Sequence, residues 1–253
     1  VGSEMCIRDR YKGDDSPVTV ADRAVEEKFR ELLAKEFPND GIQGEEFPEK
    51  LPEGKFKWII DPIDGTFSFI HGVPLWGSLL ALEFEGEVVA GWAYMPELGE
   101  LITAIKGGGA KWYQGYDIKR GAFRVKMPIK QKIGPNKLQD AVWCHTSSDY
   151  FTATNKRSLL EKLETTCAAT RCWSDCYGLL LLATGRVDLV VEPSLQYWDY
   201  APFKVIFPEV GLKISDFSGK ECFGESSLIA GNEILLNSFI GLYDDNNKLE
   251  SAV

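Results

Sequence analysis

The chain has 253 residues, 44% of them hydrophobic, and a formal net charge of −10 at pH 7. The acidic balance excludes nonspecific binding to nucleic acid or to an anionic membrane surface, but it allows a phosphorylated ligand where bound metal ions invert the local charge. No apolar run approaches the ~20 residues that a membrane-spanning helix needs, and the six irregularly spaced cysteines lack the pattern of a disulfide framework. We therefore expect a cytoplasmic protein with a sizeable core, without nucleic acid or a membrane as partner.

The chain is expected to divide into three parts. Residues 1–10 show neither hydrophobic periodicity nor a turn signal, so we expect them to lie outside the fold. Residues 11–127 are predicted to form a first half with an antiparallel sheet and the candidate metal- and phosphate-binding residues. Residues 128–253, which begin with a linker, are predicted to alternate strands and helices as α/β proteins do, and to complete the site.

The first predicted helix begins at Thr19 and ends near Phe37. Thr19 and Asp22 have the spacing of a capping box, in which each side chain accepts a hydrogen bond from the other residue's backbone. Capping alone would therefore explain Asp22. One apolar face follows at helical spacing: Ala21, Val25, Phe29, Leu32 and Leu33.

Glu45 follows a short predicted strand. In G-I-Q-G-E-E, residues 41–46, Gly44 ends the strand, and Glu45 and Glu46 lie just beyond it. Paired glutamates are usually solvated surface residues. Their position ahead of the next buried strand makes Glu45 a candidate functional residue.

That next strand, in K-W-I-I-D-P-I-D-G-T at 57–66, is predicted to stop before Asp61 and to turn. Asp61 and Asp64 lie three residues apart at this turn, and a plain polar turn is the alternative. Gly65 permits unusual backbone angles, and Thr66 can begin a helix whose first N–H groups suit a phosphate. Carboxylates beside a phosphate site form the arrangement that Mg²⁺ favours.

The rest of the first half is predicted to be an antiparallel meander. Apolar runs alternate with turn residues over 77–113, and a further strand follows over 123–127. The three glycines at 107–109 are not followed by Lys and Ser or Thr, so they indicate a hairpin turn and not a nucleotide-binding loop.

Strands and helices alternate in the second half. Strands are predicted over 141–144, 187–191, 212–214 and 228–230. Helices are predicted over 156–163, 175–183, 199–208 and 233–243. Asp175 and Asp199 each begin a helix, where an N-cap is the ordinary role, and Glu192 follows a strand, where a solvated position is the ordinary one.

Five acids therefore lie at element boundaries, where one sheet edge could bring them together: Asp22, Glu45, Asp61, Asp64 and Asp199. Such a cluster suits hydrolysis of a phosphate ester with two or three metal ions.

The ordered motifs G-E-E, D-P-I-D-G-T and W-D-x-A resemble the inositol monophosphatase superfamily, the lithium-sensitive magnesium phosphatases, from about residue 16 to the end of the chain. The resemblance implies an α/β fold with alternating α/β/α/β/α layers, the inositol monophosphatase-like sugar-phosphatase fold. It also implies two or three Mg²⁺ ions, a small phosphorylated substrate and a homodimer. Pro202 departs from the pattern, because the superfamily has Ala or Gly there.

The resemblance also implies a role for each matching residue. The metal ligands would be the side chains of Glu45, Asp61, Asp64 and Asp199 and the carbonyl of Ile63. Gly65 and Thr66 would hold the phosphate through their N–H groups. The catalytic residues would be Asp22, Thr66 and Glu45, with Asp22 and Thr66 orienting the attacking water.

Three further stretches are similar to the histidinol-phosphate phosphatase branch: S-P-V-T-V-A-D, D-G-T-F-S-F-I-H-G-V-P-L-W-G and S-D-C-Y-G-L-L-L-L-A-T-G-R-V-D-L-V-V-E. In that branch the acids matching Asp175 and Glu192 face the substrate. The expected reaction is hydrolysis of L-histidinol phosphate in histidine biosynthesis. An inositol 1-phosphate or other polyol or sugar phosphate phosphatase is the alternative. A non-catalytic metal-binding relative is the alternative from another class, and the presence of every expected acid argues against it.

Overall fold

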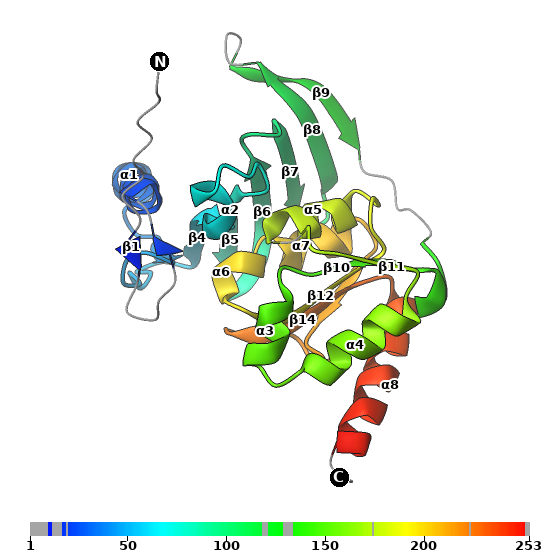
Figure 1. The fold of residues 1–253 in the computed structure, drawn as a ribbon. Helices are drawn as coiled ribbons and strands as arrows, with labels where there is room; N and C mark the ends of the chain where they lie inside the picture. The colour runs from blue at the N-terminus through cyan, green and yellow to red at the C-terminus, as the bar shows by residue number, and fades with distance from the viewer. Residues whose placement is uncertain are drawn as a thin grey trace, which may run out of the picture.

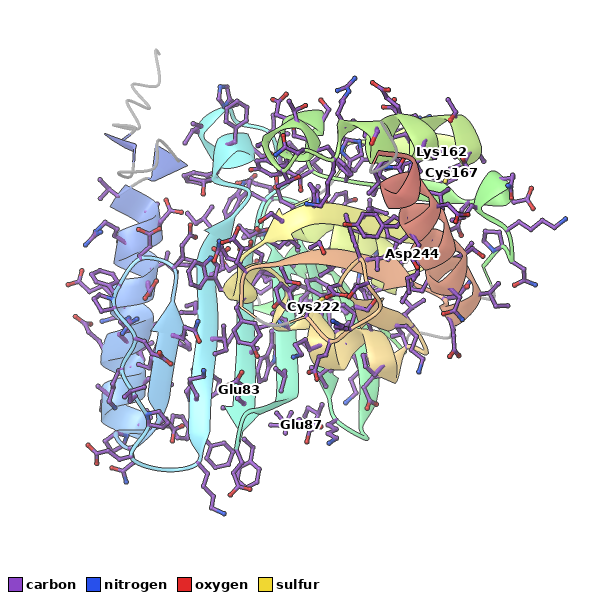
Figure 2. The ribbon with its side chains drawn as sticks, turned by 90° about the horizontal axis from the view of Figure 1, so that it is seen from below. Glu83, Glu87, Lys162, Cys167, Cys222 and Asp244 are labelled. Carbon is purple, nitrogen blue, oxygen red and sulfur yellow. The ribbon has the colours of Figure 1, made fainter. Side chains whose placement is uncertain are left out.

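The computed structural model describes residues 10–11, 17–18, 20–117, 121–128, 134–173, 175–222 and 224–250. Within these residues, a seven-stranded and a five-stranded sheet alternate with three layers of helices, and β1 and β2 form a separate two-stranded sheet (Figure 1). The view in Figure 2 places α1 Val20–Glu36 and α8 Glu233–Glu250 on opposite sides of the molecule. The predicted α/β/α/β/α layering is confirmed. No helix in these described parts combines the length and apolar character that a membrane crossing requires.

The larger sheet follows the order of the chain. Its strands are β3 Gly41–Gly44, β4 Phe56–Asp64, β5 Gly77–Phe84, β6 Glu87–Met95, β7 Glu100–Ile105, β8 Gly109–Asp117 and β9 Ala122–Pro128. β3 is parallel to β4, and the other neighbours are antiparallel. The predicted meander is confirmed, and Gly107 lies in the β7–β8 turn with a φ of +73° that favours glycine.

The smaller sheet has the order β11-β10-β12-β14-β13. Its strands are β10 Val142–Cys144, β11 Ala169–Arg171, β12 Leu189–Leu195, β13 Lys213–Ser215 and β14 Ser226–Gly231. β10 is parallel to β11 and β12, whereas β14 is antiparallel to both its neighbours. Leu189 and Val191 of β12 pack in one core and Val190 packs in another. This strand is therefore apolar on both faces.

Two helices fill the space between the sheets, α5 Cys176–Ala183 and α7 Phe203–Glu209. α5 contacts β5 of the larger sheet and β12 of the smaller one, and α7 contacts β6 and β13 in the same way. All four leucines of α5 are buried, as a helix between two sheets requires. The main core lies here.

Helices also cover the two outer faces. α1 packs on β4, with Phe29 and Leu33 against Ile42 and Ile60. α4 Arg157–Thr166 and α8 pack on the smaller sheet, together with η1 Leu138–Asp140 and α3 Ser148–Ala153. Thr19 of the predicted capping box lies outside the described residues. So does the predicted extraneous segment 1–10, except for Arg10, which belongs to β1 Arg10–Tyr11 and pairs with β2 Pro17–Val18.

The prediction that a strand stops before Asp61 is wrong. β4 continues to Asp64, with a register shift in which Asp61 pairs with Leu79 and Asp64 pairs with Gly77. An advance of three residues along β4 therefore corresponds to an advance of two residues along β5, so β4 contains one extra residue, which is a β-bulge. Pro62 is tolerated because it lies in the bulge, where its missing N–H removes no regular ladder bond.

The helix predicted over 199–208 is two helices. α6 Tyr197–Tyr200 begins two residues earlier, and α7 begins after Pro202. Pro202 has no N–H to continue α6, but its fixed φ suits a helix start, and its carbonyl accepts a bond from Ile206. Asp199 therefore lies inside α6 and is not its N-cap.

The strand predicted over 187–191 also continues further, so that Glu192 lies within β12 and is buried. The solvated strand end considered for Glu192 is therefore wrong. α3 and β11 were not predicted. The signal for α3 is the T-S-S-D sequence, in which the Ser147 hydroxyl accepts the Asp149 N–H and caps the helix.

Gly44, just before Glu45, is required by the close approach of Glu26. A Cβ on Gly44 would lie 2.2 Å from the Glu26 carboxylate. That carboxylate is fully buried, accepts the Glu46 N–H at 2.8 Å and pairs with Arg30 at 2.8 Å, so it cannot move away without breaking these bonds.

We expect Gly44→Ala to lower the free energy of unfolding by about 1–3 kcal/mol, the usual cost of overpacking. Urea denaturation measures the change. Gly54→Ala is the matched control, because its nearest neighbouring atom is 3.7 Å away. Equal effects of the two substitutions would show that the Glu26 contact does not constrain this strand end.

Candidate active site

A cavity of about 710 Å³ collects most of the predicted site residues. Its lining comes from both halves of the chain: Glu45, Asp61, Ile63, Asp64, Gly65, Thr66, Phe67, Ser68, Thr146, Ser147, Asp149, Tyr150, Asp175, Ser194, Leu195, Gln196 and Asp199. Of the residues singled out in the sequence, only Asp22 and Glu192 are absent from this lining.

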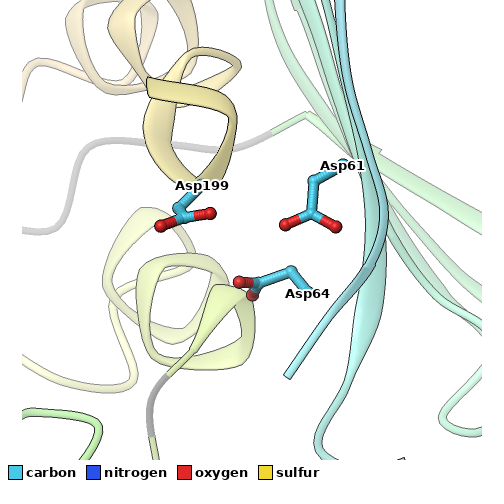
Figure 3. A group of neighbouring side chains, drawn as sticks. All are labelled: Asp61, Asp64 and Asp199. Atoms are coloured by element: carbon cyan, nitrogen blue, oxygen red, sulfur yellow. The ribbon is translucent and has the colours of Figure 1, made fainter. Parts of the chain in front are cut away.

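Three carboxylates converge in the cavity, those of Asp61, Asp64 and Asp199 (Figure 3). One oxygen of each lies within 4.8 Å of the others. Residues three apart on a regular strand point to opposite faces. The bulge in β4 supplies the extra residue that turns Asp61 and Asp64 to the same side.

Backbone groups fix two of these carboxylates. The N–H of Cys176, the first residue of α5, donates to Oδ2 of Asp64. Asp199 is the third residue of α6, and its Oδ2 accepts the Gln196 N–H at 2.7 Å as one half of a capping box. A side-chain hydrogen bond to Asp61 also contributes to the environment of Asp199.

Burial and mutual repulsion raise the pKa values of all three acids. Desolvation comes first for Asp61 and Asp64, followed by neighbouring carboxylates, and both pKa values are raised well above the usual value. Desolvation raises the pKa of Asp199 to about 7, although the Gln196 N–H opposes the shift. Glu45, at the end of β3, adds charge and a hydrogen bond at Asp61. Within the described chain, Oδ1 of Asp61 has no hydrogen-bond partner.

Next to the acids, α2 Thr66–Ile70 begins at Gly65. Gly65 has a φ of +83°, and a Cβ there would lie 3.0 Å from the Leu75 carbonyl and 3.1 Å from Asp175 Oδ2. Thr66 Oγ1 donates to the Ile63 carbonyl at 3.1 Å, which closes the turn. Only glycine fits this position, which brings the start of α2 against Asp175.

Asp175 belongs to a second polar group on the other side of Gly65. Its backbone N–H donates to Thr146 Oγ1 at 3.1 Å, and that hydroxyl donates to Glu192 at 3.1 Å. The Asp175 side chain makes no cap bond to α5, so the N-cap role does not explain it. Its φ of +55° and ψ of −156° are strained for a residue with a side chain, as is common at functional sites. Burial raises its pKa to about 6.

Two predicted residues do not line the cavity. Asp22 is buried in the first turn of α1. Glu192 is buried in β12 and reaches the cavity through Thr146. Sequence reasoning missed Thr146 and Tyr150, which line the cavity from the start of α3. Desolvation, followed by the charges of Asp175 and Asp64, raises the pKa of Tyr150 to about 12.

The family model described as the inositol monophosphatase family matches residues 4–246. A histidinol-phosphatase of Chlorobaculum parvum is 38% identical over 224 residues, which cover 87% of this chain and 81% of that protein. An inositol-1-monophosphatase of Rhizobium meliloti is 33% identical over 239 residues, which cover 92% of this chain and 84% of that protein. A solved structure of a Thermotoga maritima IMPase has a TM-score of 0.78 at 28% identity, over 94% of this chain and 87% of that one.

The raised pKa values predict an inverse dependence of stability on pH. Between the ordinary Asp pKa of ~3.9 and the value of about 7 for Asp199, the unfolded chain releases a proton that the folded chain retains. Stability from this group is complete below pH ~4 and is lost as the pH rises to about 7. In EDTA, we therefore expect the Tm of Asp199→Asn minus the Tm of the unsubstituted chain to be more positive at pH 7.5 than at pH 5.

Differential scanning fluorimetry at the two pH values measures this difference, which we expect to be at least about 3 °C, the shift from about 1 kcal/mol in a chain of this size. Asp149→Asn, at the exposed rim of the same cavity, is the control and should give no difference. A difference of the opposite sign would show that Asp199 is ionised in the metal-free fold.

Proposed function

The chain belongs to the inositol monophosphatase family of phosphomonoester hydrolases, and on this premise we propose that it hydrolyses L-histidinol phosphate to L-histidinol and phosphate with Mg²⁺ as cofactor. The matches to named phosphatases set aside the non-catalytic alternative. The position of Asp175 against the start of α2 carries the choice of substrate.

The acids fit a divalent cation. Asp61 is 2% exposed and has an oxygen without a partner in the described structure. Two more carboxylates lie within 4.8 Å of it. Desolvation destabilises the ionised form of all three acids. A bound cation stabilises the ionised acids because it balances their charges. Asp61, Asp64 and Asp199 would hold two or three Mg²⁺ ions, together with Glu45 and the Ile63 carbonyl. Bound Mg²⁺ supplies charge neutralisation for a phosphoryl group and acidifies a water ligand.

The chain's own groups can orient the phosphate and the water. The first N–H groups of a helix have no acceptor within the helix, so Gly65 and Thr66 can donate to phosphate oxygens. The Thr66 hydroxyl donates to the Ile63 carbonyl, so its oxygen can still act as an acceptor, which supports the proposed role of Thr66 in orienting the attacking water. Asp22 stays a candidate catalytic residue by resemblance alone, because it does not line the cavity.

Asp175 favours a leaving group with an ammonium. Its carboxylate is adjacent to Gly65, and therefore to the proposed phosphate position. Thr146 donates to Glu192, which brings a second acidic side chain to the same region. A charge-assisted hydrogen bond is stronger than a neutral one. Histidinol carries a primary ammonium, whereas inositol is neutral, and the acidic pair therefore favours histidinol phosphate.

A neutral polyol phosphate remains the second candidate, because a relative named inositol-1-monophosphatase covers 92% of the chain at 33% identity. Phosphate release from histidinol phosphate, inositol 1-phosphate and fructose 1,6-bisphosphate, with and without MgCl₂, separates the candidates. We expect kcat/KM to be highest for histidinol phosphate, and release to require MgCl₂. Faster release from inositol 1-phosphate would overturn the choice of substrate.

In the same assay, we expect Asp64→Asn to lower kcat at least ~100-fold on every substrate, because it removes a metal-positioning charge. The amide oxygen can still accept the Cys176 N–H, so the fold should survive. Near-normal turnover at saturating MgCl₂ would contradict the role of Asp64 as a ligand.

Asp175→Asn tests the recognition of the ammonium. A hydrogen bond to a charged group contributes roughly 1.5–3 kcal/mol, so we expect kcat/KM for histidinol phosphate to fall about 10- to 150-fold. Hydrolysis of inositol 1-phosphate should change much less. Asn has nearly the same size and shape as Asp, so the substitution adds no new steric demand at this strained backbone position.

Asp149→Asn is the control for a change in the general charge of the cavity, and it should affect both substrates alike. Equal losses on both substrates in Asp175→Asn would mean that Asp175 supports the fold or the metal ions and does not select the leaving group.

A further inference from the structure

α6 is too short to fix its own position. It has four residues, and a single helical turn gains too few hydrogen bonds to offset the ordering of its backbone. The capping box joins Asp199 to Gln196 within the same turn, so it cannot place that turn relative to β4. The position of the Asp199 carboxylate opposite Asp61 therefore depends on contacts between α6 and other elements.

One such contact is a buried hydrogen bond between α6 and β5. The hydroxyl of Tyr197, the first residue of α6, donates to Oε1 of Glu83. Tyr197 is 9% exposed and Glu83 is 5% exposed. Oε2 of Glu83, labelled on the larger sheet in Figure 2, lies 3.2 Å from Nζ of Lys57, its register partner on β4. Lys57 in turn donates to Gln43 of β3 at 3.1 Å. A polar row thus crosses three strands and ends on α6.

This row lies on the face of the sheet that carries the site. Lys57, Ile59 and Asp61 alternate along β4 and share one face, and Ile59 packs in the core between the sheets. Glu83 lies four residues along β5 from Leu79, the register partner of Asp61, or about 13 Å away. α6 contacts both β4 and β5. The helix is therefore held on this face at one place by Tyr197 and meets the site at another through Asp199.

The neighbouring row on this face, Ile59 beside Ala81, is apolar. Burying a carboxylate in place of an apolar side chain costs desolvation free energy. Its hydrogen-bond and ion-pair partners offset this cost without a net gain in stability. What a hydrogen bond adds over apolar packing is direction, because the donor must point at the acceptor. The Glu83 position thus has the chemistry of a contact that fixes geometry.

We propose that the Glu83–Tyr197 hydrogen bond is a positioning contact, which holds α6 so that Asp199 completes the metal site and thereby sets the affinity for divalent cations. The inference rests on the proposed role of Asp199 as a metal ligand. Neither Glu83 nor Tyr197 lines the cavity, so both act through α6.

Tyr197→Phe removes the donor and keeps the ring. Titration of the full-length, metal-free protein with MgCl₂ by isothermal calorimetry measures affinity without turnover. We expect about 10-fold weaker binding, the lower end of the effect of outer-shell partners on metal affinity. Glu83→Gln keeps an acceptor oxygen but loses the charge, and we expect about threefold weaker binding. The double variant should bind no more weakly than Tyr197→Phe alone, because both changes remove one interaction. At saturating MgCl₂, kcat should stay within about threefold.

Glu100→Gln is a matched control for loss of a buried carboxylate. Glu100 is 7% exposed, lies on β7 of the same sheet and accepts bonds from Trp112 and Arg186. It does not line the cavity. We expect this variant to lower Tm while leaving the affinity for MgCl₂ within twofold.

The inference would be overturned if Tyr197→Phe lowers Tm as Glu100→Gln does but leaves the affinity for MgCl₂ unchanged. If Tyr197→Phe does not fold, unchanged affinity in Glu83→Gln has the same meaning. Asp199→Asn, titrated alongside, separates the two levels of the argument. If Asp199→Asn binds MgCl₂ weakly and Tyr197→Phe binds it normally, only the positioning role is wrong. If Asp199→Asn binds MgCl₂ normally, the assignment of Asp199 as a metal ligand, on which that role depends, is wrong.

Discussion

Repulsion among carboxylates at close range is the constraint on which the rest of the structure depends. Two unit charges 4.8 Å apart repel by about 3.5 kcal/mol at an effective dielectric constant of 20, and three acids here lie within that distance of one another. The site can relieve this repulsion by taking up protons, as the raised pKa values of Asp61 and Asp64 indicate, or by binding a cation. The fold must hold the acids together in either case.

Three different backbone devices hold them. A bulge in β4 turns Asp61 and Asp64 to one side, the first N–H of α5 binds Asp64, and a capping box orients Asp199. Strand and helices belong to different layers, so the site forms only when the larger sheet and the middle helices pack correctly. The apolar face around Ile59 and the all-buried leucines of α5 supply that packing. Stability of the core and geometry of the site are therefore linked.

The sequence predicted what is encoded locally. The meander follows from periodicity and turn residues, the cluster around Asp64 follows from a compact motif, and the layers follow from the family that these motifs resemble. It could not predict the bulge at Pro62, which depends on pairing with β5, or the break between α6 and α7, where one proline ends a helix and begins another. The buried position of Glu192 is set by β14, its partner strand. The bond between Glu83 and Tyr197 joins residues 114 apart and leaves no local signal. The domain division at residue 128 and the homodimer stay predictions.

The layout of the cavity separates the residues proposed for chemistry from those proposed for selectivity. Glu45 and the residues from Asp61 to Thr66 come from two neighbouring strands and the turn after them, and they would serve any phosphate ester. Asp175 and Glu192, which Thr146 links, come from the N-cap of α5 and from β12, and they are proposed to face the leaving group. The two groups adjoin at Gly65 and at the Cys176 N–H, which binds Asp64, so a change in a side chain of the second group can spare the first where it leaves the backbone at the start of α5 in place. This arrangement gives a physical reason why relatives named for histidinol phosphate and for inositol phosphate can match the same chain over most of its length.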